Sequence, residues 1–327
     1  MKKILVAGHI CLDIIPKLHR MDPFIPGSLV EVGSATLSTG GAVSNVGRAL
    51  HRLGVPMTMV GLIGTDVFGQ NVQSLLGPLA SCFQVREDVS TSYSIVLDPP
   101  GQDRMFMHYP GANADFSSAT VTDYALSLVD HLHFGYPPLM RSMIERDGAE
   151  LTDLFRRAKA AGLSTSLDLS VPDTESLAGH VDWPGILRSV LPFVDDFMPS
   201  QDDLSVMFAT VNPVHTVAKA HELGASRVVL KCGEDGVLLS DENGALWQRC
   251  FPVQVVGATG AGDATIAGYL YGKFHGKTPA ESIRLGCAVG AFCCESADAV
   301  SGIPTSAELH ARLDGEWRAE DFETPQA

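Results

Sequence analysis

Short apolar runs alternate with amphipathic stretches along most of the chain. Apolar runs of roughly four to eight residues are typical of buried parallel strands. Apolar residues spaced three and four positions apart, such as Ala42, Val46, Ala49 and Leu53, are typical of helices. On this pattern we predict strands at 2–8, 57–64, 131–134, 163–169, 193–198 and 226–231, and helices at 41–53, 139–161, 213–223, 262–274 and 280–295.

Repeated strand–helix units predict an α/β fold, in which helices cover both faces of a mostly parallel sheet. Two hairpins interrupt the alternation. The first joins strands at 92–98 and 104–108 through the turn 99–102, and the second turns at Asn243-Gly244. Asp66 precedes a further helix and is placed to cap it. Ligands of such sheets bind beyond the carboxyl ends of the strands, so the residues that follow each strand are the candidates for a site.

Composition narrows the class of protein. The 327 residues hold 23 Lys and Arg against 38 Asp and Glu, a net charge of −15, which would repel nucleic acid and anionic membranes. Lys2-Lys3 and the apolar run behind them resemble a signal peptide, but His9 and Asp13 interrupt the run. No apolar stretch reaches the ~18 residues of a membrane span. The 7 cysteines form no CxxC pair, which favours reduced thiols and a cytoplasmic protein.

The glycine-rich turn 257–264, which opens the helix at 262–274, has the most specific chemistry. Gly260 and Gly262 allow an oxygen-rich ligand to approach the backbone, and the amides at a helix start favour negative charge. Asp263 stands where a P-loop has lysine, so the turn is an anion hole with a carboxylate beside it. That pairing suits phosphoryl transfer to an alcohol. The alternative is that Asp263 only caps the helix and the glycines only form a tight turn.

Two separated motifs resemble those of the ribokinase-like sugar kinases of the PfkB carbohydrate kinase family. The first comprises Gly40-Gly41-Ala42-Val43-Ser44-Asn45 and, after Leu53-Gly54, the stretch 60–69 (VGLIGTDVFG). The second is 259–264 (TGAGDA) with Ala267-Gly268. Pro110-Gly111-Ala112-Asn113 and other short matches fall in the family's order, so the resemblance extends over about residues 3–312. It implies one ribokinase-like domain over 1–327, with a small β-strand lid formed from about 15–37 and 90–110.

The resemblance also implies an activity: transfer of the γ-phosphoryl of ATP to a sugar hydroxyl, with Mg²⁺. It makes Asp263 the catalytic base and the amides of Gly260, Ala261 and Gly262 the anion hole. Further roles follow by position. The sugar would be held by Asp13, Gly40, Gly41 and Asn45, and the nucleotide side would be lined by Lys231, Gly233 and Gly236. The family's lids often pair with one another, so a homodimer through the lid is a further expectation.

Two departures from the family pattern concern metal ions. Gly257-Ala258 stand where the family usually has Asp-Thr, whose aspartate helps to bind a monovalent cation, and this speaks against activation by potassium. The family's Asn-x-x-Glu metal motif appears as Ser200-Gln201-Asp202-Asp203. Asp203 keeps a carboxylate and would hold Mg²⁺ through water.

Other hypotheses and residues stay open. A nucleoside kinase of the same family and a non-catalytic sugar or nucleotide sensor are the alternatives, whereas a nicotinamide-dependent oxidoreductase lacks its fingerprint. The absence of a basic run in the first third of the chain favours a neutral sugar. We expect the remaining candidates to be structural or solvated: Asp66 as a cap, Arg104 and His108 as solvated lid residues, His9, His131 and His133 as structural residues, and Cys293-Cys294 as buried hydrophobes. Asp168 ends a strand at the correct edge and is a candidate contact of substrate or metal.

Overall fold

The structure, a computed structural model, describes residues 2–19, 26–99 and 104–317. Its main feature is an eight-stranded sheet in which β13 is antiparallel to both of its neighbours, β12 and β14, and the other pairs are parallel. The predicted mostly parallel sheet is therefore confirmed. In spatial order the strands are β14 (Gly244–Gln248), β13 (Val237–Asp241), β12 (Val228–Lys231), β11 (Asp196–Phe197), β10 (Ser164–Leu167), β9 (His131–Gly135), β1 (Ile4–Gly8) and β4 (Met57–Val60).

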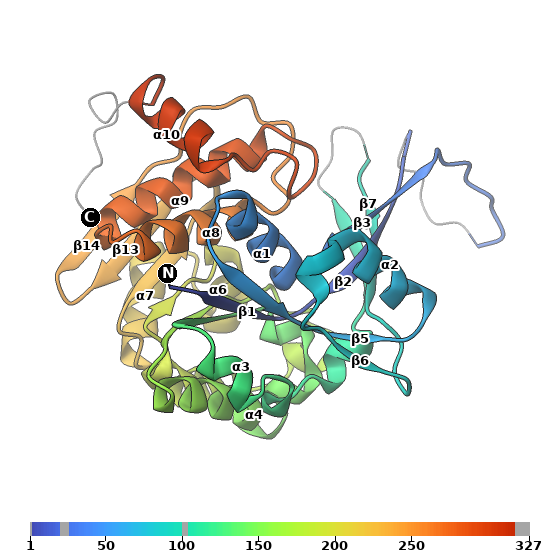
Figure 1. The fold of residues 1–327 in the computed structure, drawn as a ribbon, viewed down its shortest axis with the longest axis horizontal. Coiled ribbons are helices and arrows are strands. Elements are labelled where there is room, and N and C mark those ends of the chain that lie inside the picture. Colours follow the sequence, from blue (N-terminus) through green and yellow to red (C-terminus); the bar gives the residue numbers. More distant parts are fainter. Residues whose placement is uncertain (1, 20–25, 100–103, 318–327) are drawn as a thin grey trace.

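Helices cover both faces of this sheet (Figure 1). Successive side chains of a strand point to opposite faces, and β1 buries both sets. Ile4 and Val6 pack in the core under α1 (Ala42–Arg52), α8 (Ala261–Phe274), α9 (Pro279–Cys294) and α10 (Ser306–Asp314). Leu5 and Ala7 pack in the core on the opposite face, under α3 (Asp123–Ser127), α4 (Arg141–Ala160), α5 (Trp183–Val190), α6 (Gln201–Phe208) and α7 (Pro213–Glu222). No described helix is both long and apolar enough to cross a membrane.

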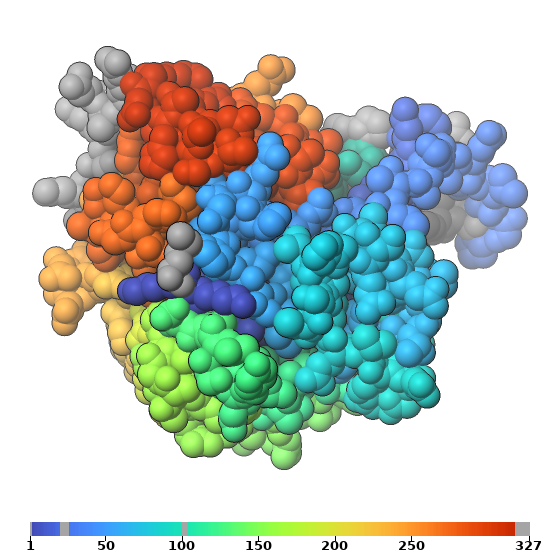
Figure 2. Space-filling view, viewed as in Figure 1, coloured from blue at the N-terminus to red at the C-terminus, as the bar shows by residue number. Residues whose placement is uncertain are grey.

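A second sheet of four strands, called the lid sheet here, projects from one side of the molecule (Figures 1 and 2). Its order is β3 (Ala35–Gly40), β2 (Cys11–Pro16), β7 (Tyr93–Leu97) and β8 (Met105–Tyr109). The turn expected at 99–102 lies mostly outside the described residues. Only His9 and Ile10 separate β1 from β2, and the buried Asn113 clamps this junction, because its side chain bonds both the amide (3.2 Å) and the carbonyl (2.8 Å) of Ile10.

Along the sequence, a strand pair and a helix come between β4 of the large sheet and β7 of the lid sheet. They are β5 (Leu62–Gly64), which pairs in parallel with β6 (Gln84–Arg86), and α2 (Val67–Leu76). Asp66 caps α2 as predicted, since its carboxylate accepts a bond from the amide of Gly69 (2.9 Å).

Three element predictions were wrong in their extent. The strand expected at 57–64 divides at Gly61, where a Cβ would lie 2.8 Å from Ile10, and its second half leaves the large sheet. The helix expected at 139–161 is interrupted at Glu145–Gly148, where the backbone is not helical. The strand expected at 193–198 is reduced to the two residues of β11, and its first expected residue, Phe193, belongs to a 3₁₀ turn at Leu191–Phe193.

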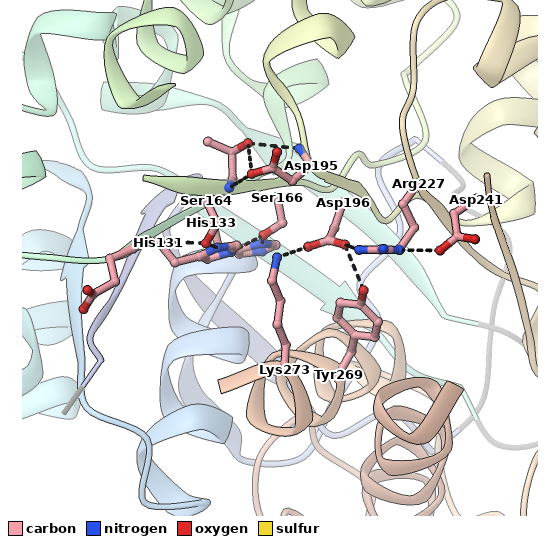
Figure 3. Close-up of polar contacts among 12 residues, drawn as sticks. His131, His133, Ser164, Ser166, Asp195, Asp196, Arg227, Asp241, Tyr269 and Lys273 are labelled. Carbon is pink, nitrogen blue, oxygen red and sulfur yellow. Dashed lines mark hydrogen bonds and ion pairs between the residues drawn. The ribbon is translucent and has the colours of Figure 1, made fainter. Parts of the chain in front are cut away.

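A buried polar network anchors α8 to the large sheet (Figure 3). Asp196 on β11 is fully buried and bonds Tyr269 (2.8 Å) and Lys273 on α8, and also Arg227 (3.0 Å). Tyr269 and Lys273 follow one face of the helix, so these bonds hold α8 in place along and around its axis. The first turn of the same helix carries Asp263.

Candidate active site

The candidate residues gather at the carboxyl ends of β1, β9, β10 and β12, beside the first turns of α1, α6 and α8. Parallel strands of one sheet end at the same edge, and helix N-termini there expose free amides. Residues far apart in the sequence therefore meet. Asp263 is the centre of this group, and its side chain is 3% exposed.

Two donors hold one oxygen of the Asp263 carboxylate. The side-chain amide of Asn45 (2.9 Å) and the phenol of Tyr136 (2.8 Å) both donate to Oδ2. The other oxygen, Oδ1, is buried and has no hydrogen-bond partner in the described part of the chain. Burial raises the pKa of Asp263, whereas Asn45, Lys231 and Tyr136 act against the rise. A buried carboxylate with one free oxygen is suited to accept a proton.

Asn45 is brought to this carboxylate and does not cap its own helix. The N-cap of α1 is Gly41, at φ 87°, and it makes no side-chain cap bond. A Cβ at Gly41 would lie 2.5 Å from Nδ1 of His9, so only glycine fits where α1 starts beside the β1–β2 junction. Asn45, on the first turn of α1, is therefore free to bond Asp263.

Sequence reasoning missed Tyr136. It follows β9 directly and adopts a left-handed conformation at φ 66°. The signal that could have found it is its position immediately after a buried strand, at the edge where Asp168 was already a candidate.

Lys231 lies among three carboxylates. Its ammonium pairs with Asp168 (2.7 Å), whose side chain is fully buried. Burial lowers the pKa of Lys231, but the charges of Asp168, Asp203 and Asp263 outweigh that effect and raise it. Burial also raises the pKa of Asp168 to about 7, although Lys231 opposes the shift. A Cβ at Gly262 would lie 3.6 Å from the Lys231 ammonium, so this charge is next to the glycine-rich turn.

The turn itself needs glycine at position 260. Gly260 is the N-cap of α8 at φ 76°, and a Cβ there would lie 2.4 Å from that of Ala299. Of the three amides expected to form the anion hole, that of Ala261 donates to the carbonyl of Ala258 (3.2 Å). The amides of Gly260 and Gly262 donate to no carbonyl among the described residues.

Asp13 lies on β2, at the base of the lid sheet. The thiol of Cys11 donates to its Oδ1 (3.3 Å), and a Cβ at Gly40 would lie 2.1 Å from its Oδ2. The missing side chain at Gly40 therefore makes room for the carboxylate. Burial raises the pKa of Asp13 to about 6.

Asp203 bonds its own helix start. Its carboxylate accepts the amide of Ser200 (2.7 Å) while the hydroxyl of Ser200 accepts the amide of Asp203 (3.0 Å), which is a capping box. No group of three or more Asp, Glu, His or Cys that could hold a metal ion is found in the described ranges. These residues fit an ion that brings most of its own oxygen ligands, as Mg²⁺ does when it arrives with nucleotide phosphates and water.

The two glycines expected on the nucleotide side shape the turn between β12 and β13. Gly236 is at φ 100°, and a Cβ there would lie 2.0 Å from the carbonyl of Gln248. Gly233, at φ 57°, faces open space. Gly236 is thus required by packing, whereas nothing packs within 4 Å of a Cβ at Gly233.

The lid residues Arg104 and His108 are not solvated as expected. Arg104 donates to the carbonyl of Ala297 (2.7 Å), in the loop that packs on the glycine-rich turn. Nε2 of His108 contacts Nε2 of His9 (3.3 Å). Both residues therefore hold the lid sheet against distant segments, His108 against the β1–β2 junction and Arg104 against the loop that follows α9.

His131, His133 and Cys293 are buried structural residues, as expected, whereas Cys294 is less buried than expected. His131 and His133 are fully buried and share the hydroxyl of Ser166 (2.8 Å each) in the network of Figure 3. Cys293 is buried, whereas Cys294 is only half-buried.

Known proteins resemble this chain over nearly its whole length. It is 26% identical over 302 residues to the ATP-dependent 6-phosphofructokinase of Thermoanaerobacterium thermosaccharolyticum, covering 92% of this chain and 90% of that protein. The solved Arabidopsis thaliana ribokinase complexed with ribose and ATP superimposes with a TM-score of 0.78 at 21% identity, covering 95% of this chain and 98% of that one. The solved fructokinase with bound ATP from Xylella fastidiosa superimposes with a TM-score of 0.78 at 21% identity. The match covers 97% of this chain and 99% of that one. These structures show the ribokinase-like fold.

The family is established by sequence. Residues 1–306 match the profile of the pfkB family carbohydrate kinases. The chain therefore belongs to the PfkB family of carbohydrate kinases, and it is a phosphotransferase that acts on an alcohol group.

Proposed function

We propose that this kinase phosphorylates a neutral sugar, with Asp263 as the general base. The observation that supports this most strongly is the free, buried Oδ1 of Asp263 beside the helix start that carries the unbonded amides of Gly260 and Gly262. A base must lie within hydrogen-bond reach of the proton that it removes, and an anion hole must lie where negative charge develops. Both groups belong to the first turn of α8.

The reaction is an in-line displacement. The sugar hydroxyl oxygen forms a bond to the γ-phosphorus of ATP while the bond from that phosphorus to the β–γ bridging oxygen breaks, and ADP leaves. The hydroxyl proton passes to Oδ1 of Asp263. The amides of Gly260 and Gly262 stabilise charge on the transferring group, and the amide of Ala261 supports the turn.

The sugar side comprises Asp13, Gly40, Gly41 and Asn45. Asp13 accepts hydrogen bonds from sugar hydroxyls, for which a carboxylate is suited. Its described side-chain contacts are Cys11 and Ser94, and neither is basic. A phosphorylated sugar would need a cation here, so an uncharged acceptor fits better.

The nucleotide side comprises Lys231, Gly233 and Gly236, with Lys231 next to the phosphates. Mg²⁺ would be held by phosphate oxygens and water, with Asp203 as a contact through water, and it would neutralise charge on the phosphates when bound. Gly257-Ala258 offer no carboxylate for a monovalent cation, so we expect turnover without potassium.

The lid sheet would close over the sugar and exclude water, which suppresses hydrolysis of ATP. A second copy of the chain is a further proposed partner of this sheet. Its edge strand β8 exposes Phe106 (55%) and Met107 (50%), one on each face of the strand. Unpaired edge strands with apolar side chains are sites of strand pairing.

The test of this function is Asp263→Asn, assayed by ADP release over ribose, fructose, 2-keto-3-deoxygluconate, phosphorylated hexoses and nucleosides, with and without potassium. We expect kcat to fall about 10²–10⁴-fold while nucleotide affinity, measured by calorimetry, is kept. Asp195→Asn is the matched control, because Asp195 pairs with Lys159 away from the site. Full turnover in Asp263→Asn would refute the role of Asp263. If a nucleoside is the best acceptor, the protein is a nucleoside kinase and the proposal of a neutral sugar is wrong.

A further inference from the structure

Tyr136 occupies a conformation that few tyrosines adopt. Its φ of 66° lies in the left-handed region, which costs a residue with a side chain roughly 1–2 kcal/mol. The conformation turns the chain between the end of β9 and the prolines at 137–138. Tyr136 is half-buried, and its phenol donates to Asp263 across 127 positions of sequence.

The position of that hydrogen bond matters more than its presence. Tyr136 and Asn45 donate to the same atom, Oδ2, from two different places in the fold, the turn that follows β9 and helix α1. Oδ1 receives neither bond. A carboxylate with both donors on one oxygen cannot exchange its two oxygens by rotation without breaking both bonds.

We propose that Tyr136 is a positioning residue, which together with Asn45 clamps Oδ2 of Asp263 and so reserves Oδ1 to receive the proton of the acceptor hydroxyl. The inference rests on the proposed role of Asp263 as the base. It adds a residue that acts through Asp263 and need not touch the sugar. Backbone strain of this kind persists where the surrounding contacts over-determine a side chain's place.

The charged and titratable groups around Asp263 determine how its pKa changes when the hydrogen bond from Tyr136 is lost. Lys231 faces Asp263 from β12, Asp203 from α6, Asp168 from the end of the strand β10, just after its last residue, and Cys293 from α9. Among them only Lys231 favours the ionised carboxylate, and it is already paired with Asp168. Without the phenol, burial and the neighbouring carboxylates prevail, so the pKa of Asp263 rises further.

The experiment is Tyr136→Phe, which removes one oxygen atom and keeps the ring. We expect the acid limb of the kcat/KM profile to move to higher pH by about one unit and kcat at pH 7 to fall about tenfold. The KM for ATP should stay as in the wild type. The pKa of Asp263 itself is read from ¹³C NMR of aspartate-labelled protein, with Asp263→Asn identifying its resonance.

Tyr269→Phe is a matched control. Tyr269, which is buried, also donates to an aspartate at 2.8 Å, and it lies on the helix that carries Asp263. Its loss should lower the melting temperature like that of the Tyr136 hydroxyl, but leave the pH profile unshifted.

The outcomes separate the two proposals. An unshifted acid limb and an unshifted Asp263 resonance in folded Tyr136→Phe would overturn the positioning role, whatever Asp263→Asn shows. Full turnover in Asp263→Asn would instead remove the base itself. An equal shift in Tyr269→Phe would assign the effect to general loosening of α8 and would also overturn the inference.

Discussion

At Asp13, the ionised carboxylate that suits sugar binding also lowers the stability of the fold. It is a mostly buried carboxyl whose described partners are a thiol and a hydroxyl, so burial raises its pKa from an ordinary value near 3.8 to about 6. An acid with a raised pKa in the folded state favours folding less as the pH rises through the range between the two values. At pH 8 the protein therefore keeps an ionised Asp13 at a cost in stability, and gains an acceptor for sugar hydroxyls.

Asp13→Asn should make the protein more stable and less active. At pH 8 we expect the free energy of unfolding to rise by about 1–3 kcal/mol, because the charge is gone. The gain should shrink as the pH falls from 8 toward 4, because the wild-type carboxyl then becomes protonated in the folded state and its charge is no longer buried. Urea unfolding across pH 4–8 measures the stability, and the KM of the sugar should rise. A gain that does not depend on pH would contradict this explanation.

At the scale of elements, α8 connects the chemistry to the core. Its first turn holds Gly260 and Asp263, and its later turns are tied to Asp196 (Figure 3). Glycines at positive φ lie at both ends of the helix, Gly260 at 76° and Gly276 at 73°. Their surroundings differ, since a Cβ at Gly260 would meet Ala299 whereas a Cβ at Gly276 would meet nothing within 4 Å.

Alanine substitutions at these two glycines separate the energetic cost of a left-handed backbone from that of a steric clash. Gly276→Ala should lower the free energy of unfolding by about 1 kcal/mol, through the left-handed conformation alone, with kcat retained. Gly260→Ala should cost about 2–4 kcal/mol, because the turn must also move away from Ala299. It should lower kcat as the amides of the turn are displaced. Equal losses in stability and full activity for both variants would show that the contact with Ala299 does not hold the turn.

At the scale of the whole molecule, polar contacts of His108 and Arg104 hold the outer side of the lid sheet against the rest of the protein. His108 meets His9, and Arg104 meets the carbonyl of Ala297. Burial lowers the pKa of His9, and that of His108 to about 4, so both rings are neutral at physiological pH and contact without charge repulsion. The outer strand β8 keeps its apolar side chains exposed.

A dimer through β8 should be broken by a charge at the centre of its apolar surface. We expect Phe106→Asp to be monomeric in sedimentation velocity at concentrations where the wild type is dimeric. Leu128→Asp is the control, because Leu128 is similarly exposed (52%) but lies beyond the lid sheet. The net charge of −15 makes copies repel, so salt should strengthen the wild-type dimer. A wild type that is monomeric at all concentrations would contradict the proposal.

The sequence by itself determined the class of fold, the order of most elements and the glycine-rich turn with its aspartate. These features are local: apolar periodicity, cap residues and glycine spacing act over one or two turns of chain. Strand ends and interruptions were missed where a tertiary contact decided them, as at Gly61 against Ile10.

Only the tertiary structure decided which side chains meet at the site. Asn45 and Tyr136 lie 218 and 127 positions from Asp263, and Lys231 lies 63 from its partner Asp168. No periodic pattern marks such pairs, because they depend on how the sheet orders its strands and on what space burial leaves for each polar group. The same burial raises the pKa values of Asp13, Asp168 and Asp263, since removal from water penalises charge wherever the fold puts it.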